Sequence, residues 1–351
     1  MKFTLQEGPM KHPVIRIAVL LSILVLFSAN VSAATLTSHK KMMAQLALLS
    51  KKDANAGRVS VVNIGTSVKG RDIPLVIITD PAVPEESKKR LFIICRQHGD
   101  EPATTEAMLR LISRLAVLED QDVADILSKV SFYFVPMVNP DGADAFRRKN
   151  ANGADLNRDW INLSQPETRC VWAAIDAAAP DVLLDMHELS PGNRTGDFIE
   201  SAGALCGATD GVVKETTILQ NLVVGMLHTH DMAVRSVRIN DRAPARLAHR
   251  YFPIREGLKT LLLETRQAGA RKYQLAYRME LHVIGAMTVA KYLAGQQGEL
   301  EARIADYYAR KYNVASRGKK PAKKNQQPPV KVEPAADKSS GGIEIKIEQQ
   351  Q

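Results

Sequence analysis

The chain has 351 residues, 45% of them hydrophobic, which is enough for the core of one large globular domain or two ordinary ones. Its net charge is +9, but residues 1–33 hold three basic side chains and one acidic one, and residues 314–351 hold eight basic and four acidic ones. The globular part is therefore nearly balanced in charge. Because no recognisable nucleic-acid-binding motif is present either, the sequence argues against a nucleic-acid partner.

The first 33 residues have the features of a secretory signal peptide. Three basic residues precede the apolar run IAVLLSILVLF, and the small residues of VSA-A suit cleavage after Ala33. An uncleaved membrane anchor is the alternative, but the run is shorter than the about 20 residues that span a bilayer. We therefore predict that residues 1–33 are a cleaved signal peptide and that the chain contacts the membrane only transiently, through this peptide. The mature protein is predicted to be secreted, with the periplasm as its destination.

Strand-like apolar runs alternate with helical patterns over the predicted globular part, residues 34–313. Six runs predict strands: VSVVNI, IPLVIIT, RLFIIC, VSFYFVPMV, DVLLDM and KTLLLE. Their Val, Ile, Leu and Phe content is typical of strands buried on both faces. Apolar spacing predicts helices that begin at Pro102 and that cover about 166–178, 212–232, 279–294 and 299–312. We predict a single α/β domain with a mixed, mostly parallel central β-sheet flanked by helices.

Residues 314–351 are predicted to form a disordered basic tail. The segment RGKKPAKKNQQPP and the Ser, Gly, Glu and Gln mixture after it cannot bury enough apolar surface to become ordered. A solvated extension is the favoured interpretation of this tail. The alternative is an arm that makes weak contact with the anionic cell envelope.

Three cysteines are too few for a disulfide framework, and an odd number cannot all pair within one chain. If one bridge forms, we expect it to join Cys170 to Cys206. Cys95 lies within the apolar run LFIIC and is expected to be a small buried apolar residue.

The stretch RQHGDEP, residues 96–102, follows an apolar run and places His98 three residues before Glu101. Taken alone, it suits a polar turn as well as a metal site. Two histidines and one glutamate are a standard ligand set of catalytic zinc, with a fourth position open. His187 is the candidate third ligand, because it ends the buried run DVLLDMHE, where the carboxyl end of a strand delivers side chains to a cleft. His249 and His282 have no companion motif.

Metal-assisted hydrolysis also needs a carboxylate that is not a ligand, to move the proton of the attacking water. Glu264 is the candidate, because it ends the apolar run LLLE, where a buried charge is costly unless it faces a cleft. A structural ion pair with Arg266 is the alternative. Arg148 and Arg158 lie in a loop dense in Asn, Asp and Gly, and guanidinium groups near zinc would suit a substrate that ends in a free carboxylate.

Five motifs occur in the order HGDE, NPDG, RRKNANGADLNRDW, DMHE and LLLETR. In this order they resemble the zinc carboxypeptidase family typified by carboxypeptidases A and B, which includes bacterial murein-peptide amidases. The motifs extend over residues 98–266, and the similarity covers about 55–296. The resemblance implies a zinc carboxypeptidase-like fold for the predicted catalytic domain, residues 34–313.

The resemblance also implies residue roles. His98, Glu101 and His187 look like the ligands of one Zn²⁺ per chain, and Glu264 looks like the general base. Asp155 matches the aspartate that holds the imidazole of His98 and so fixes its tautomer.

Other roles concern the substrate. Arg148 matches the arginine that polarises the scissile carbonyl, and Asn157 with Arg158 matches the pair that grips the terminal carboxylate. Tyr251 is the candidate for the tyrosine that closes over the substrate. The residue that reads the terminal side chain is expected in the segment 240–257.

The resemblance thus implies an exported zinc-dependent metallocarboxypeptidase that hydrolyses the C-terminal peptide bond of peptides by metal-activated water. A murein-peptide amidase that cuts between γ-D-glutamate and diaminopimelate is the alternative within the fold. A deacylase of small amides is less favoured, since Asn157 and Arg158 match peptidases better. A non-catalytic module that binds peptides or the cell wall would be expected to lack Glu264 or a ligand. The predicted partner is a peptide or murein peptide with a free carboxylate.

Overall fold

The structure is a computed structural model that describes residues 36–52, 57–117, 120–193, 195–239, 245–267 and 274–317. The predicted signal peptide and nearly all of the predicted tail lie outside these residues. Contacts divide the chain into a unit that ends at Asp306 and a second unit that begins at Tyr307. Among the described helices, none combines the length and the apolar character needed to cross a membrane.

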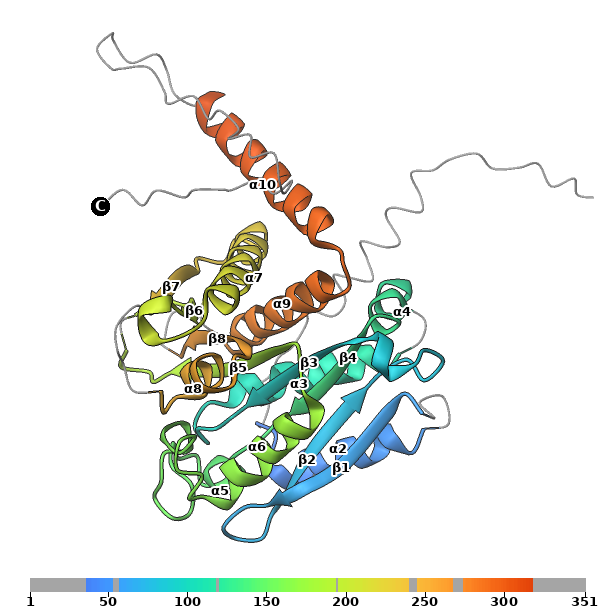
Figure 1. Cartoon of the computed structure of the whole chain (residues 1–351), viewed down its shortest axis with the longest axis vertical. Helices are drawn as coiled ribbons and strands as arrows, with labels where there is room; N and C mark the ends of the chain where they lie inside the picture. Colours follow the sequence, from blue (N-terminus) through green and yellow to red (C-terminus); the bar gives the residue numbers. More distant parts are fainter. Residues whose placement is uncertain are drawn as a thin grey trace, which may run out of the picture. The chain divides into compact units, whose positions relative to one another are not determined.

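An eight-stranded sheet forms the centre of the first unit, with the strand order β1-β2-β4-β3-β5-β8-β6-β7 (Figure 1). The strands are β1 (Val59–Thr66), β2 (Asp72–Ile78), β3 (Lys89–Cys95), β4 (Val130–Val135), β5 (Val182–Leu189), β6 (Phe198–Ala202), β7 (Arg235–Ile239) and β8 (Lys259–Arg266). The pairs β3·β4, β3·β5, β5·β8 and β6·β7 are parallel, and β1·β2, β2·β4 and β6·β8 are antiparallel. The predicted fold class, a mixed and mostly parallel sheet flanked by helices, is confirmed.

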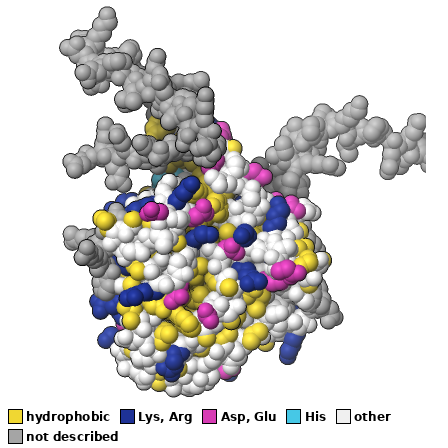
Figure 2. All heavy atoms as spheres, viewed as in Figure 1, with side chains coloured by type: hydrophobic (Ala, Val, Ile, Leu, Met, Phe, Trp, Pro, Cys, Tyr) yellow, Lys and Arg dark blue, Asp and Glu magenta, His cyan; other side chains and the backbone are white. Residues whose placement is uncertain are grey.

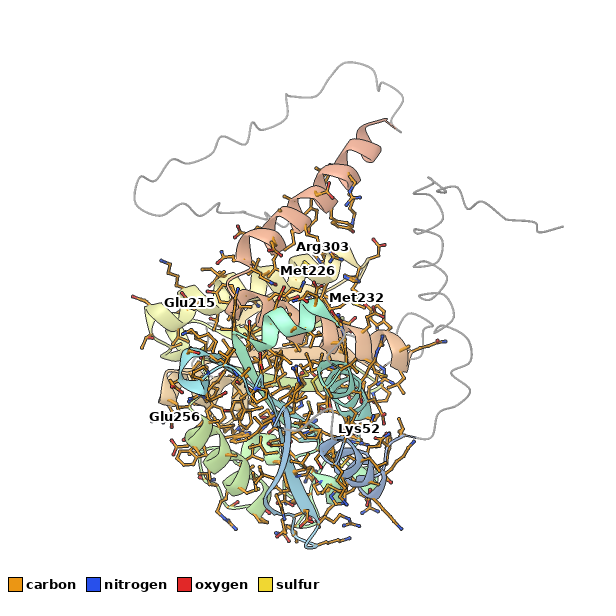
Figure 3. All side chains as sticks on the ribbon, turned by 90° about the vertical axis from the view of Figure 1, so that its right-hand side faces the viewer. Lys52, Glu215, Met226, Met232, Glu256 and Arg303 are labelled. Atoms are coloured by element: carbon orange, nitrogen blue, oxygen red, sulfur yellow. The ribbon has the colours of Figure 1, made fainter. Side chains whose placement is uncertain are left out.

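Helices cover both faces of this sheet, and each face has its own apolar core. One core joins the sheet to α2 (His39–Ser50), α3 (Pro102–Leu115), α4 (Gln121–Leu127), α7 (Asp210–Thr229) and α9 (Leu275–Leu293). The other joins it to α6 (Pro166–Ala178) and to α8 (Ala248–Tyr251) with the π-helical turn η5 (Phe252–Glu256). Figure 3 labels Met226 of α7, a buried side chain that lines a pocket together with Met287 and Thr288 of α9.

The predicted helices correspond to α3, α6, α7, α9 and α10 (Gln297–Arg317), and α6 has the predicted bounds. Helix α10 continues past the predicted end at residue 312. The short helices α4, α5 (Pro140–Asp144) and α8, and the N-terminal helix α2, were not predicted.

Three expectations about strands and cysteines need correction. Strand β1 is not buried on both faces, because it is an edge strand whose Val62 is 48% exposed. Strands β6 and β7 were missed, since each has five residues and polar side chains interrupt the apolar pattern. No disulfide joins Cys170 of α6 to Cys206 of the 3-10 turn η4 (Ala204–Cys206). Cys95 is fully buried in the larger core, as predicted.

Acidic and basic side chains are interspersed on the face of the molecule shown in Figure 2. This mixture agrees with the near balance of charge in the globular part of the sequence.

Candidate active site

The carboxyl ends of β5 and β8 carry two of the predicted site residues side by side. The two strands are parallel, and His187 is paired in register with Glu264. Successive side chains of a strand point to opposite faces of the sheet. Because Met186 and Leu263 belong to the core under α3 and α9, His187 and Glu264 point to the opposite face, toward α6 and α8.

The loop from β3 to α3 brings His98 and Glu101 to the same edge. Close backbone contact shapes this loop, since a Cβ atom on Gly99 would lie 2.0 Å from the carbonyl carbon of Gly142. Asn139 fixes the contact, because its Nδ2 donates to the carbonyl oxygens of Gln97 at 3.1 Å and Arg148 at 3.2 Å. The HGDE and NPDG motifs therefore pack against each other.

Gln97 connects this loop to two other motifs. Its Nε2 donates to Asp185 Oδ1 at 2.6 Å, and its Oε1 accepts from the indole nitrogen of Trp160 at 2.8 Å. Gln97 and Trp160 are fully buried. Segments far apart in the sequence are thus held together by buried hydrogen bonds.

Three predicted ligands converge in the structure. His98 Nδ1 lies 2.6 Å from Glu101 Oε1, His187 Nδ1 lies 2.8 Å from Glu101 Oε2, and the two Nδ1 atoms are 3.1 Å apart. One ligand atom from each residue lies within 4.8 Å of the others, and all three residues are buried. Among the described residues, this is the one such group of His, Cys, Asp or Glu side chains.

The other nitrogen of each imidazole faces a carboxylate. His98 Nε2 lies 3.0 Å from Asp155 Oδ1, and His187 Nε2 lies 3.0 Å from Asp185 Oδ1. A carboxylate at Nε2 favours the tautomer with its proton on Nε2, which leaves the Nδ1 lone pair for a metal. The structure therefore places Asp155 against His98 and adds a matching aspartate for His187.

The charges around this cluster favour a cation. Burial alone would raise the pKa of Glu101, but His98 and His187 lower it to about 2. Burial also opposes the ionisation of Asp155 and Asp185, yet their contacts with histidines lower both pKa values. Carboxylates that remain charged while buried are suited to a metal ion, and two imidazoles with one carboxylate form a donor set typical of zinc.

Glu264 lies in the same cavity, of about 260 Å³, as the three candidate ligands. Burial raises the pKa of Glu264 to about 8, while His187 opposes the shift and Glu101 and Asp185 add to it. A dication nearby would lower this pKa toward the neutral range in which a general base works.

Arg148, Asn157 and Arg158 line this cavity too. Arg148 Nη2 lies 3.0 Å from Asp155 Oδ2, and 43% of the arginine side chain remains exposed. Asn157 is buried, with Oδ1 accepting from the backbone nitrogen of Ala248 at 2.9 Å and Nδ2 at 3.0 Å from His187 Nε2. Arg158 Nη1 donates to the carbonyl oxygen of Asn157 at 3.0 Å.

Tyr251 is not among the residues that line this cavity, so that its predicted closure over a substrate stays a prediction. Successive helical residues point about 100° apart, so that α8 directs His249 and Arg250 into the cavity and Tyr251 away from it. The hydroxyl of Tyr251 donates to Glu256 Oε1 at 3.0 Å, and its ring packs edge-on against Phe252.

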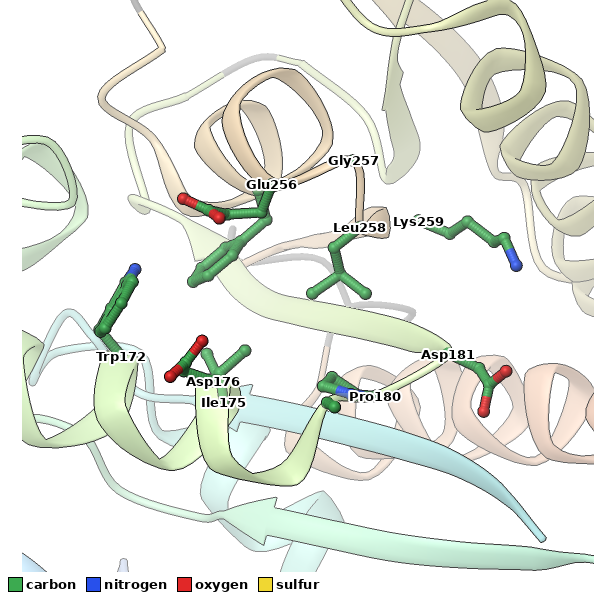
Figure 4. Close-up of a pocket in the computed structure, with 11 residues that line it drawn as sticks. Trp172, Ile175, Asp176, Pro180, Asp181, Glu256, Gly257, Leu258 and Lys259 are labelled. Atoms are coloured by element: carbon green, nitrogen blue, oxygen red, sulfur yellow. The ribbon is translucent and has the colours of Figure 1, made fainter. Parts of the chain in front are cut away.

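A second pocket, of about 410 Å³, lies at the amino ends of β5 and β8 (Figure 4). Trp172, Asp176, Glu256 and Lys259 are among its lining residues. None of the predicted site residues lines it.

Three functional candidates were missed by sequence reasoning: Asp185, Glu200 and His249. Asp185 interrupts a buried apolar strand two residues before His187 and so shares its face, which was an available signal. Glu200 lies on β6, a strand that was not predicted. His249 appeared isolated in the sequence, but it is buried against Asp185 and Glu200 in the structure.

Comparisons with known proteins agree with this geometry. Residues 46–181 match the family described as zinc carboxypeptidase. Carboxypeptidase 2 of Trichophyton rubrum is 33% identical over 149 residues, which are 40% of this chain and 28% of that protein. Carboxypeptidase E of Caenorhabditis elegans is 35% identical over 122 residues, 30% of this chain and 25% of that protein. The chain thus matches about a quarter of the length of these relatives.

Solved structures show the same fold. A metallo-carboxypeptidase from Burkholderia cenocepacia has a TM-score of 0.62 and 24% identity, over 72% of this chain and 68% of that one. One from Pseudomonas aeruginosa has a TM-score of 0.61 and 22% identity, over 74% of this chain and 70% of that one.

Proposed function

Because residues 46–181 match the zinc carboxypeptidase family, we propose that the chain hydrolyses the C-terminal peptide bond of peptides with a free terminal carboxylate. The observation that carries the proposal is the convergence of His98, Glu101 and His187 in one cavity with Glu264 and Arg148. The arginines that line the cavity supply an anchor for the terminal carboxylate.

The candidate ligands fit zinc by donor type, spacing and the carboxylates behind both imidazoles. Zinc held there would supply a Lewis acid that polarises the scissile carbonyl and lowers the pKa of the attacking water. The chain itself contributes Glu264, which accepts a proton from that water and returns it to the leaving amine. Arg148 donates to the carbonyl oxygen as negative charge develops there.

Arg158 is the proposed anchor of the terminal carboxylate, because a guanidinium group can bind a carboxylate with two parallel hydrogen bonds. Asn157 lies beside it, but its Oδ1 is already engaged with the backbone nitrogen of Ala248. Its proposed role is to orient this wall of the cavity as well as to contact the carboxylate.

The test compares zinc-loaded protein with a Glu264→Gln variant on peptides with free and with amidated C-termini. We expect release of the terminal amino acid from the free peptides only, with kcat lower by about 10²- to 10⁴-fold in the variant. Chelation should abolish the activity and added zinc should restore it. Glu256→Gln, outside the cavity, is the matched control. Equal rates for wild type and Glu264→Gln at full zinc occupancy would contradict the proposal.

Export is part of the proposal as well. It rests on the signal-like residues 1–33, whose cleavage after Ala33 would release a catalytic domain at 34–313 and a basic tail at 314–351. The N-terminal sequence of the protein recovered from cell fractions tests it, with Ala34 as the expected first residue in the periplasm.

A further inference from the structure

His249 of α8 is a buried histidine that bridges two carboxylates behind the candidate zinc site. It is 3% exposed, its Nδ1 lies 3.1 Å from Asp185 Oδ2, and its Nε2 lies 2.9 Å from Glu200 Oε1. Asp185 belongs to β5 and Glu200 to β6, and β8 separates these strands in the sheet. The imidazole of His249 thus joins two strands that do not pair with each other.

Asp185 and Glu200 occupy one row across the sheet. Each pairs in register with Leu262 of β8, Asp185 through a parallel pair of strands and Glu200 through an antiparallel pair. Residues paired in register point to the same face of a sheet, so that both carboxylates point toward α8. Because α8 contacts β5, β6 and β8, it can place one imidazole between the two carboxylates.

These two contacts require a proton on each ring nitrogen of His249. A charged carboxylate accepts hydrogen bonds and donates none, whereas a neutral imidazole has a single N–H group. Only the imidazolium form of His249 can therefore donate to Asp185 and Glu200 together. Burial alone would lower the pKa of His249, but the hydrogen bonds and the charges of the two carboxylates raise it. Burial would raise the pKa of Glu200, but His249 and Arg250 lower it.

The two oxygens of the buried Asp185 carboxylate have different partners. Oδ1 accepts from Gln97 Nε2 at 2.6 Å and lies 3.0 Å from His187 Nε2, and Oδ2 faces His249. The terminal torsion of an aspartate is soft, so contacts at Oδ1 alone do not fix the plane of the carboxylate. Without His249, Oδ2 would also be buried without that donor, which is unfavourable.

The aspartate behind the other candidate histidine ligand shows the same arrangement. Asp155 Oδ1 lies 3.0 Å from His98 Nε2, and Asp155 Oδ2 lies 3.0 Å from Nη2 of Arg148, a cation. Asp185 likewise has its imidazole ligand at Oδ1 and His249 at Oδ2. His249 therefore occupies, for one aspartate, the place that a guanidinium group occupies for the other. The difference is that the Arg148 side chain is 43% exposed, whereas His249 is buried.

We propose that His249 is a positioning residue of the zinc site. Its imidazolium group, anchored by Glu200, holds Asp185 in the orientation in which that carboxylate fixes the tautomer of His187 and directs its Nδ1 toward the metal. His249 acts on His187 only through Asp185. The inference rests on the zinc site of the proposed function, but its tests do not depend on hydrolysis.

The first test observes the ring protons of His249 in the wild type, without zinc and with it. Heteronuclear NMR of protein with isotope-labelled histidine detects each ring nitrogen that carries a proton, because burial slows the exchange of these protons with water. At neutral pH we expect His249 to show protons on both Nδ1 and Nε2 in both samples. A ring with only one proton overturns the inference, and this result requires no variant to fold.

The second test is a double-mutant cycle on zinc affinity, measured by competition with a chelator. Asp185→Asn should lower the affinity about 10- to 100-fold, as is usual for a residue that holds a metal ligand, and His249→Gln should lower it about tenfold. Because His249 acts through Asp185, the double variant should match Asp185→Asn alone within about twofold. Melting temperatures check that each variant folds.

His282→Gln is the matched control for the cycle. His282 is also a buried histidine, but it belongs to α9 and lies 3.4 Å from Thr265 Oγ1. Any effect of His282→Gln on zinc affinity reflects the general loss of a buried histidine. That effect should multiply with the effect of Asp185→Asn, because the two residues act independently.

The outcomes separate this inference from the proposed function. If the effects of His249→Gln and Asp185→Asn multiply, or if His249→Gln leaves zinc affinity unchanged or raises it, the inference is overturned, while hydrolysis by the wild type would still support the proposed function. Two ring protons on His249 and a shared effect on zinc affinity, in a protein that hydrolyses none of the peptides, support the inference and overturn the proposed function.

Discussion

Single residues at this site act mainly by positioning one another. His98 and His187 present Nδ1 to the same point because Asp155 and Asp185 face their Nε2 atoms. Glu101 is held from behind, since its Oε2 accepts from the backbone nitrogen of Glu188 at 3.1 Å. Residues outside the ligand motif therefore orient the candidate ligands. Gly99 is as important for their positions, because only a residue without a side chain lets the loop approach Gly142 so closely.

Gly99→Ala tests that loop. Its new Cβ would lie 2.0 Å from the Gly142 backbone, so we expect the loop to shift, the free energy of unfolding to fall by about 1–3 kcal/mol, and zinc affinity to fall with it. Denaturant titration and competition with a chelator measure the two effects. Gly196→Ala is the control, because a Cβ there meets nothing within 4 Å. Unchanged zinc affinity in Gly99→Ala would contradict this account of the loop.

At the scale of elements, the site depends on where parallel strands end. Strands β3 and β5 are neighbours, and so are β5 and β8, which places the loop after β3 and the ends of β5 and β8 at one edge. Helix α9 supports β8 from the opposite face and carries His282, which is fully buried. Its Nε2 is 3.4 Å from Thr265 Oγ1, and its Nδ1 has no partner among the described residues.

The burial of His282 makes α9 sensitive to acid. Burial lowers the pKa of His282 to about 3, with Arg278 and His187 adding to the shift. The unfolded chain, with an ordinary histidine pKa of about 6.5, then binds the proton more readily than the folded one. Neutral His282 therefore makes its full contribution to the free energy of unfolding above about pH 6.5. Each pH unit below that lowers the free energy of unfolding by up to about 1.4 kcal/mol.

His282→Gln removes this titration. We expect the difference in free energy of unfolding between wild type and variant to shrink from pH 6.5 to pH 4.5, as measured by urea titration at several pH values. Both proteins share every other titrating group, so that the difference isolates His282. A difference that stays constant over this range would show that His282 is not held neutral.

At the scale of the whole molecule, every site residue lies in the unit that ends at Asp306. The last apolar residues of α10 that are buried in this unit are Leu300 and Ile304. Residues from Tyr307 onward belong to the second unit, where Tyr308 stacks on Tyr312 with ring centroids 6.2 Å apart. The first unit therefore contains what the proposed chemistry requires.

Truncation after Asp306 tests this division. We expect the free energy of unfolding to change by no more than about 0.5 kcal/mol, as for surface changes in general, and zinc affinity and kcat/KM on soluble substrates to be retained. Chemical denaturation and the assays above measure this. A loss of zinc binding on truncation would mean that the second unit contributes to the site.

The sequence by itself determined the main strands, the long helices and the candidate ligands, because these depend on local apolar patterns and on motifs of fixed spacing. It could not predict β6, where the cavity lining explains Glu200 and a hydrogen bond to Gln220 explains Ser201, nor the direction in which α8 turns its side chains. Tertiary structure alone decided that Tyr251 points away while His249 and Arg250 enter the cavity. The physical reason is that residues far apart in the sequence meet through the order of the strands in the sheet and through the direction in which α8 turns its side chains. These two features bring Asp185 and Glu200 within hydrogen-bonding distance of His249.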